Sequence, residues 1–141
     1  MMKKIFAILL ALALSLSLAA CGKTKGAKIT LGQSSRFTRE ELQAAADCVL
    51  ARFRKDYDGC TLKRVYYDEA KSIKLAARYI DQPQYGIYGK DPDDIVVLFS
   101  DFRTDDTISS FEPNADYDGW SFYLIRGGKG QPWEEYTHGY G

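Results

Sequence analysis

The chain has 141 residues, of which 45% are hydrophobic and 13% aromatic, with 19 basic and 19 acidic side chains. This length is enough for one compact domain and too short for two, and the hydrophobic content argues against a disordered chain. The balanced charge argues against nucleic acid as a partner, because nucleic-acid-binding domains carry a basic excess.

Residues 1–20 have the three parts of a signal peptide: two lysines, an apolar run over residues 5–18, and small residues before Cys21. The apolar run is shorter than the ~18–20 residues of a spanning helix. Leu-Ala-Ala-Cys at residues 18–21 resembles the bacterial lipobox, in which the cysteine receives a diacylglyceryl group and the chain is cut before it. The alternative is an ordinary secretory peptide with Cys21 as a bystander. We expect lipidation of Cys21, with a doubly or triply acylated cysteine holding the protein at the extracytoplasmic face of the cell membrane.

Residues 22–36 are polar, contain three glycines and show no sustained hydrophobic period. Together with Cys21 they are expected to form a flexible tether, over residues 21–36, that lifts the domain off the membrane. Ile29 and Leu31 alternate with polar neighbours, so a short edge strand is the alternative. The folded domain is expected over residues 37–141.

The first helix of the domain has the clearest signals. Thr38 and Glu41 have the spacing of a capping box, and Phe37 and Leu42 have that of a hydrophobic staple. One apolar stripe then follows at helical spacing: Leu42, Ala45, Ala46, Val49, Leu50 and Phe53. We expect this helix to end before Asp58-Gly59.

After the first helix, the sequence predicts one strand, a second helix and then three further strands. A strand is predicted over residues 60–67, and a helix capped by Asp68 is predicted to run to Ile80. The buried face of that helix is expected to contain Ala70, Ile73, Ala76, Ala77 and Ile80. Three strands should follow, over residues 95–99, 120–126 and 133–138, with a long acidic loop over residues 104–118.

This order predicts an α+β fold: one or two helices packed on one face of a curved, mainly antiparallel, four-stranded sheet. The strand over residues 95–99 is apolar on both faces and should be central.

Cys48 and Cys60 are the two cysteines that remain after Cys21. Outside the cytoplasm such a pair can oxidise, and we expect a disulfide that joins the first helix to the first strand. The alternative is two buried free thiols, because cysteine packs as a small hydrophobe.

The candidate pocket residues are Asp101, Tyr66 and Tyr67. Asp101 continues one face of the central strand, so a tyrosine facing it could exchange protons with its carboxylate. The alternative is a salt bridge or hydrogen bond from Asp101 to a neighbouring strand. His138, the only histidine, has no orienting carboxylate or nucleophile that the sequence specifies.

No metal or cofactor is predicted. Residues 114–119 match the opening of a calcium loop, but Ile125 occupies the position where a bidentate glutamate is required. Cys48 and Cys60 lack the further His or Cys ligands of a structural zinc site.

Several stretches resemble a group of small uncharacterised bacterial lipoproteins. They are Phe-Thr-Arg-Glu-Glu at 37–41, Gly-Cys-Thr-Leu at 59–62, Tyr-Asp-Glu at 67–69, Leu-Phe-Ser-Asp-Phe at 98–102 and Trp-Ser-Phe-Tyr-Leu-Ile-Arg at 120–126. Such proteins are similar in layout to the cystatin-like or nuclear transport factor-like α+β folds. Those folds contain binding modules and a few enzymes, so the resemblance implies no particular activity.

We therefore expect a lipid-anchored, non-catalytic binding or envelope-accessory module whose partner is a protein or a small molecule. Binding would use the sheet face that the helices leave open, where Leu98, Phe102, Phe122 or Leu124 is expected. The alternatives are a small pocket enzyme that uses Asp101 with a tyrosine, and an inhibitor or immunity factor.

Overall fold

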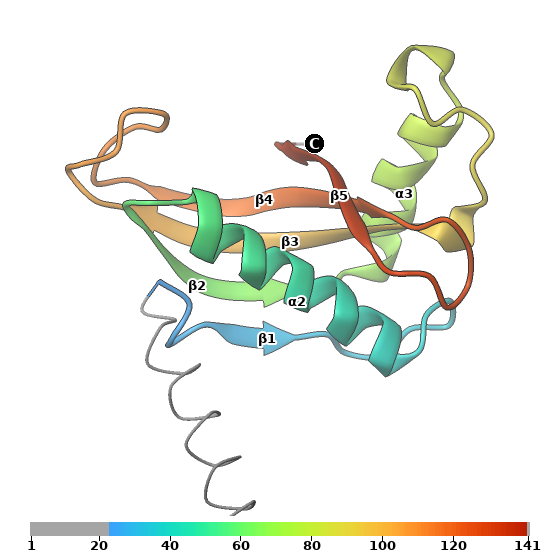
Figure 1. Ribbon diagram of the computed structural model, residues 1–141, viewed down its shortest axis with the longest axis horizontal. Helices are drawn as coiled ribbons and strands as arrows, with labels where there is room; N and C mark the ends of the chain where they lie inside the picture. Colours follow the sequence, from blue (N-terminus) through green and yellow to red (C-terminus); the bar gives the residue numbers. More distant parts are fainter. Residues whose placement is uncertain (1–22, 141) are drawn as a thin grey trace, which may run out of the picture.

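The computed structural model describes residues 23–140, so the signal peptide and Cys21 lie outside the described residues. The described part forms an α+β domain around one five-stranded sheet, with strand order β1-β2-β3-β4-β5 (Figure 1). β1 runs parallel to β2, and the other neighbours are antiparallel. The strands are β1 (Lys28–Thr30), β2 (Cys60–Tyr66), β3 (Ile95–Thr104), β4 (Asp116–Ile125) and β5 (Glu134–Gly139). The helices are α2 (Arg39–Asp56) and α3 (Glu69–Ile80), with short 3-10 turns η1 (Pro83–Tyr85) and η2 (Pro92–Asp94).

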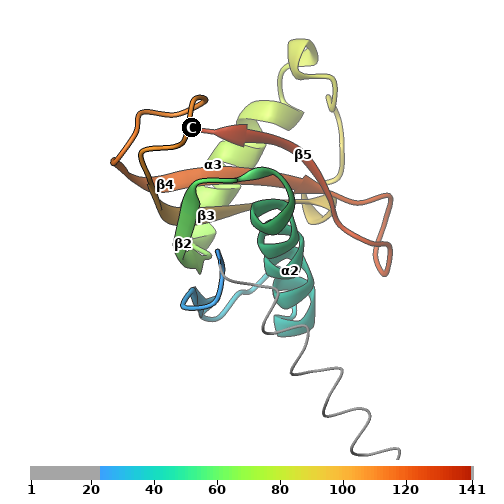
Figure 2. The same ribbon diagram turned by 60° about the vertical axis from the view of Figure 1, so that its left-hand side comes forward.

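The two helices cover opposite faces of the sheet, not one face as expected (Figure 2). Val96 and Leu98 of β3 pack in the core under α2, whereas Val97 and Phe99 pack with α3. Alternate side chains of a strand point to opposite faces, so a strand that is apolar at every position needs cover on both sides. β3 is such a strand, and α3 supplies the second cover.

The expected open face of the sheet is therefore covered. Leu98, Phe102, Phe122 and Leu124 are fully buried in the core beneath α2. The apolar binding surface that was expected at these residues does not exist in the structure.

The segment that was expected to be a tether belongs to the domain. Lys28–Thr30 pairs with β2, Leu31 is buried in the α2-side core, and the Leu62 N–H donates to the Lys23 carbonyl at 2.9 Å. The Lys23 ammonium pairs with the Asp58 carboxylate. The alternative of an edge strand near Ile29 is confirmed, and the chain is held to the sheet from residue 23 onward.

The helix caps form as predicted. Thr38 and Glu41 make both hydrogen bonds of the capping box, and the Asp68 side chain accepts from the Lys71 N–H. The predicted face of α3 was right for Ala76 and Ile80, which are buried, and wrong for Ile73, which is 37% exposed; Ser72 and Leu75 are buried instead. Ser72 is buried because its hydroxyl accepts a hydrogen bond from the Val97 N–H, beyond the point where β2 stops pairing with β3.

Arg126 joins three elements at the N-terminal end of α2. Its guanidinium pairs with Glu41, donates to Asp94 Oδ1 at 3.1 Å and to the Asp93 carbonyl at 2.8 Å, and stacks on Trp133. The Trp133 indole N–H donates to the Glu41 carbonyl at 3.1 Å. This buried cluster fixes α2 against η2 and the segment between β4 and β5.

None of the helices formed by residues 23–140 is long and apolar enough to cross a membrane.

Candidate functional site

A pocket of about 410 Å³ opens at the C-terminal end of α2. Its wall comes from that helix end, from the segment between β3 and β4, and from β4 and β5. The lining residues are Arg52, Asp56, Tyr57, Ser110, Phe111, Trp120 and His138. The volume lies within the range of small-molecule sites.

A bulge in β5 places two polar side chains on the pocket side of the sheet. Leu124 pairs with Glu135 and Tyr123 pairs with Thr137, so Tyr136 is an extra residue. Without that extra residue, Glu135 and His138 would point to opposite faces, because side chains alternate along a strand. With the bulge, both lie on the α2 face, where the His138 ring contacts Tyr57 and Phe122.

Glu135 orients both the histidine and an arginine. Its Oε1 lies 2.8 Å from His138 Nδ1, and its Oε2 lies 3.0 Å from Arg52 Nε. Arg52 also pairs with Asp56 one helical turn later, at 2.8 Å. The pocket wall thus carries a continuous chain of charged and titratable groups from His138 to Asp56.

Three buried polar atoms of the lining residues have no well-aligned hydrogen bond in the described part of the chain: Tyr57 Oη, Trp120 Nε1 and Arg52 Nε, the last of which is ion-paired with Glu135. Burial raises the pKa of Tyr57 to about 12, and a hydrogen bond from the Trp120 indole, which faces the hydroxyl, opposes this rise only in part. Tyr57 is 5% exposed. Buried hydroxyl and indole N–H groups normally have well-aligned hydrogen bonds, and these two groups make only a poorly aligned contact with each other, so the wall keeps hydrogen-bonding capacity for a ligand.

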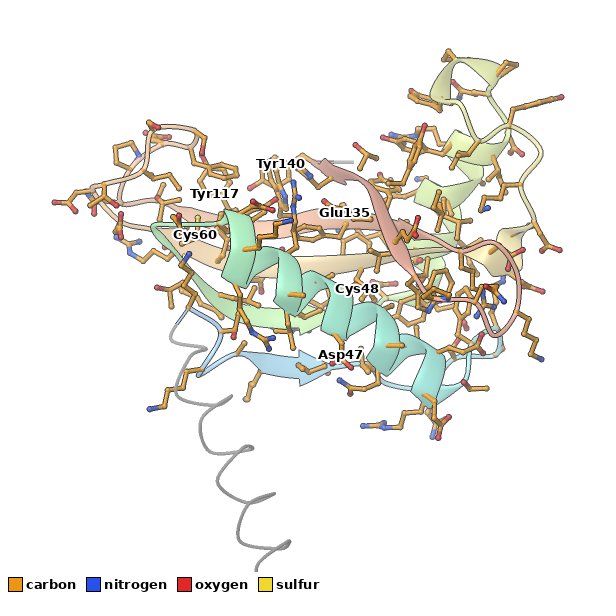
Figure 3. The ribbon with its side chains drawn as sticks, in the orientation of Figure 1. Asp47, Cys48, Cys60, Tyr117, Glu135 and Tyr140 are labelled. Carbon is orange, nitrogen blue, oxygen red and sulfur yellow. The ribbon has the colours of Figure 1, made fainter. Side chains whose placement is uncertain are left out.

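Aromatic rings continue from the pocket to the surface. Trp120 lies edge-on to Phe111 and Tyr140, with ring centroids 5.3 and 5.1 Å apart. Tyr117 stacks near Tyr140, which is 62% exposed, and Figure 3 shows both beyond the C-terminal end of α2. The pocket mouth therefore presents aromatic surface to solvent.

The contacts of His138 and Tyr57 bear on what the pocket can do chemically. Glu135 can orient His138, but no serine, threonine or cysteine of the described part donates a hydrogen bond to that ring. Tyr57, with its raised pKa, stays protonated near neutral pH and is a poor nucleophile.

The structure separates the predicted pocket residues. Asp101 and Tyr66 share the α3 side, whereas Tyr67 packs in the core on the α2 side. Asp101 Oδ1 accepts from the Gly119 N–H of β4 at 2.9 Å, which is the structural alternative considered for this residue. Burial raises the pKa of Tyr66, and the Asp101 charge adds to this effect. None of these three residues lines the pocket.

The predicted disulfide is absent from the structure, in which Cys48 and Cys60 are free thiols. Cys48 lies near the middle of α2 and Cys60 lies beyond its C-terminal end (Figure 3). The Cys48 thiol points toward the Trp133 carbonyl, 3.3 Å away, and Cys60 is buried in the core. Eight residues of helix, or about 12 Å, separate Cys48 from Asp56, and the turn does not bring the chain back along that length.

Two features of the sequence are partial signals of the pocket. Glu135 precedes the only histidine by three residues, and Trp120 begins the third predicted strand. Neither signal indicates a site without the bulge and the helix end. Among residues 23–140, no three His, Cys, Asp or Glu side chains are grouped to hold a metal ion.

Comparisons with protein-family models, curated proteins and solved structures found no match to this chain. The interpretation of the pocket therefore rests on its own geometry.

Proposed function

We propose that the protein is a lipid-anchored extracytoplasmic binding module whose pocket takes a small, neutral, hydroxylated ligand, such as a sugar. The observation that carries this proposal is the pair of buried groups on the pocket wall, Tyr57 Oη and Trp120 Nε1, which face each other without a well-aligned hydrogen bond. The anchor part of the proposal rests on the lipobox-like sequence before Cys21.

The chemistry of the wall supports this ligand class. Among the lining residues, Trp120 can only donate a hydrogen bond, Tyr57 can donate or accept, and the carboxylate of Asp56 accepts. A ligand that satisfies all of them must offer both donors and acceptors, as hydroxyl groups do. The carboxylates of Asp56 and Glu135 already pair with Arg52, so the pocket carries no strong excess charge that would favour an ion.

The aromatic rim supports the same class. Trp120 and Tyr140 meet edge to face, and Tyr140 is 62% exposed, so it presents apolar aromatic surface beside the polar wall. A sugar ring has an apolar C–H face and a hydroxylated edge, and it could pack on one surface while it bonds to the other.

Removing the Tyr57 hydroxyl tests the proposal in two ways. Tyr57→Phe should weaken the binding of a sugar probe by about fivefold, since one hydrogen bond contributes ~1 kcal/mol. The same change should raise the free energy of unfolding by about 1 kcal/mol, because it removes a buried hydroxyl whose contact with the Trp120 indole is poorly aligned. If the hydroxyl serves binding at the expense of stability, its removal should weaken ligand binding and stabilise the fold.

The measurement uses the mature lipoprotein in a detergent without a sugar headgroup. Saturation-transfer NMR with methyl glucoside and N-acetylglucosamine reports binding, and urea unfolding reports stability. Tyr88→Phe is the matched control, because Tyr88 is 66% exposed and distant from the pocket lining. Equal saturation transfer from wild type and Tyr57→Phe, or none from wild type, would contradict a sugar site. Destabilisation by Tyr57→Phe would mean that the contact with the Trp120 indole is a stabilising hydrogen bond, and this would contradict the argument for spare hydrogen-bonding capacity.

The anchor has a separate test. The membrane fraction of cells that express the full chain should contain a species with the mass of residues 21–141 plus a diacylglyceryl group and any N-linked acyl chain. Cys21→Ser should remain at precursor size. Normal processing of that variant would exclude the lipobox interpretation.

A further inference from the structure

We infer that the domain lies directly against the lipid bilayer, with the end that contains Lys23 and the α2–β2 turn facing the headgroups. This inference rests on the proposed lipidation of Cys21. It specifies an interaction surface and its partner, a lipid surface, which the proposed binding function does not require.

The first step is the length of free chain. Only Gly22 stands between Cys21 and Lys23. Two residues of fully extended chain span at most ~7 Å. The expected tether over residues 21–36 would have allowed several times this distance, but most of it is part of the domain.

The second step is that Lys23 is held firmly. Its carbonyl accepts from the Leu62 N–H at 2.9 Å, and its ammonium pairs with Asp58. The next residue, Thr24, is buried, and its carbonyl accepts from the Ala27 N–H at 3.1 Å. The attachment point therefore cannot move away from the domain without breaking contacts to β2 and to the turn after α2.

The third step identifies the surface around Lys23. The turn between α2 and β2 contains Asp58 and Gly59, and the Gly59 carbonyl accepts from the Asp105 N–H at 2.8 Å. This contact brings the start of the segment between β3 and β4 to the same end. In both ribbon views the segment over residues 82–91 lies at the far end of the molecule from residues 23–27 (Figures 1 and 2).

Charge does not oppose this orientation. Residues 23–27, 54–63 and 103–116 contain six basic and six acidic side chains, so this end is neutral overall. A neutral surface is neither repelled by an anionic bilayer nor attracted to it by a basic patch. The covalent anchor alone then decides which end meets the membrane.

The two tryptophans of the chain are built-in probes of this orientation. Trp133 donates to the carbonyl of Glu41 in the first turn of α2, whereas Trp120 lines the pocket beside Tyr57, the C-cap of the helix. Sixteen residues of helix separate those two positions, which is about 24 Å. Trp120 should therefore lie much nearer to the bilayer than Trp133.

Energy transfer from tryptophan to lipids with a dansyl headgroup measures this difference. The full lipidated protein is reconstituted in phosphatidylcholine vesicles, and Trp133→Phe and Trp120→Phe each leave one donor. Transfer from Trp120 should be several-fold larger than transfer from Trp133. If Trp133→Phe fails to fold, the difference between the unsubstituted protein and Trp120→Phe gives the Trp120 contribution.

An insertion provides the matched control. Ten Gly and Ser residues placed between Gly22 and Lys23 add a flexible span of about 17 Å, which should reduce the transfer from Trp120 to near that from Trp133. Equal transfer from both tryptophans in the lipidated protein, or no effect of the insertion, would overturn the orientation but not the anchor. Protein whose mass lacks the lipid would overturn the anchor and, with it, the orientation.

Discussion

Replacement of Arg126 by methionine would test how the N-terminal end of α2 is held to the sheet. The Arg126 side chain is only 4% exposed, and it pairs with Glu41 and Asp94, whose side chains are each 19% exposed. Methionine is long enough to fill much of the space but leaves both carboxylates without their cation. Removal of one partner of a buried ion pair costs ~3–5 kcal/mol.

We expect the lower end of that range, about 3 kcal/mol, because water can still reach Glu41 and Asp94. For a domain of this size, each kcal/mol corresponds to a change in Tm of about 4 °C, so Tm should fall by roughly 12 °C. Urea unfolding followed by far-UV circular dichroism measures the free energy directly. Arg78→Met is the control, because Arg78 is exposed on α3 and should change stability by no more than ~0.5 kcal/mol.

The cost of Arg126→Met should also depend on pH. The pKa of Glu41 lies below its ordinary value of 4.5, chiefly because its carboxylate accepts from the Thr38 N–H and also because of Arg126. A carboxylate whose pKa is lower in the folded state than in the unfolded state stabilises the fold fully at pH values above its unfolded-state pKa. This contribution is lost as the pH falls through its folded-state pKa. The difference between wild type and Arg126→Met should therefore shrink below about pH 4. A loss of less than ~1 kcal/mol at pH 7, or a difference that grows at low pH, would refute the ion-pair argument.

Three further changes test other parts of the fold. Ser72→Ala should cost about 1–3 kcal/mol in urea unfolding, because it leaves the buried Val97 N–H without an acceptor; no loss would mean that water replaces the hydroxyl. Thr38→Ala should cost about 1 kcal/mol in the same assay through loss of the N-cap, whereas Thr38→Ser should cost little. Burial raises the pKa of Cys60 to about 11, so at pH 8 its thiol should react with dithiobis(nitrobenzoate) only on unfolding; a native mass two daltons lighter than the reduced mass would instead show a disulfide to Cys48.

The elements of the fold that depend on local signals were predictable from the sequence. Thr38 and Glu41 specify the start of α2 because both hydrogen bonds of the capping box join residues that are only three positions apart in the sequence. The segment over residues 95–99 is predicted to be a central strand because it is apolar on both faces. In the structure it forms the first half of β3, which continues to Thr104. That double-sided pattern also implied cover on both faces, a consequence that the sequence-based fold did not include.

The elements that depend on distant partners were not predictable in the same way. β1 has three residues and all are exposed, so its place in the sheet comes from pairing with β2 and not from its own composition. Ser72 is polar and yet buried because it completes the hydrogen bonding of β3. The pocket likewise requires a bulge at Tyr136, whose position depends on how β5 pairs with β4.

The residues that anchor helix α2 and the residues proposed to bind a ligand lie at opposite ends of this helix. Arg126 and Trp133 hold the helix near Glu41, whereas Tyr57 lies about 24 Å away at the other end, beside the pocket. Substitutions so far apart, with no shared partner, should have additive effects on stability, within about 0.5 kcal/mol. The loss from Arg126→Met and the gain from Tyr57→Phe should therefore add in the double variant, and ligand binding should follow Tyr57 alone. A departure from additivity would mean that α2 transmits a change in packing from one end to the other, and the pocket could then no longer be treated as independent of the core.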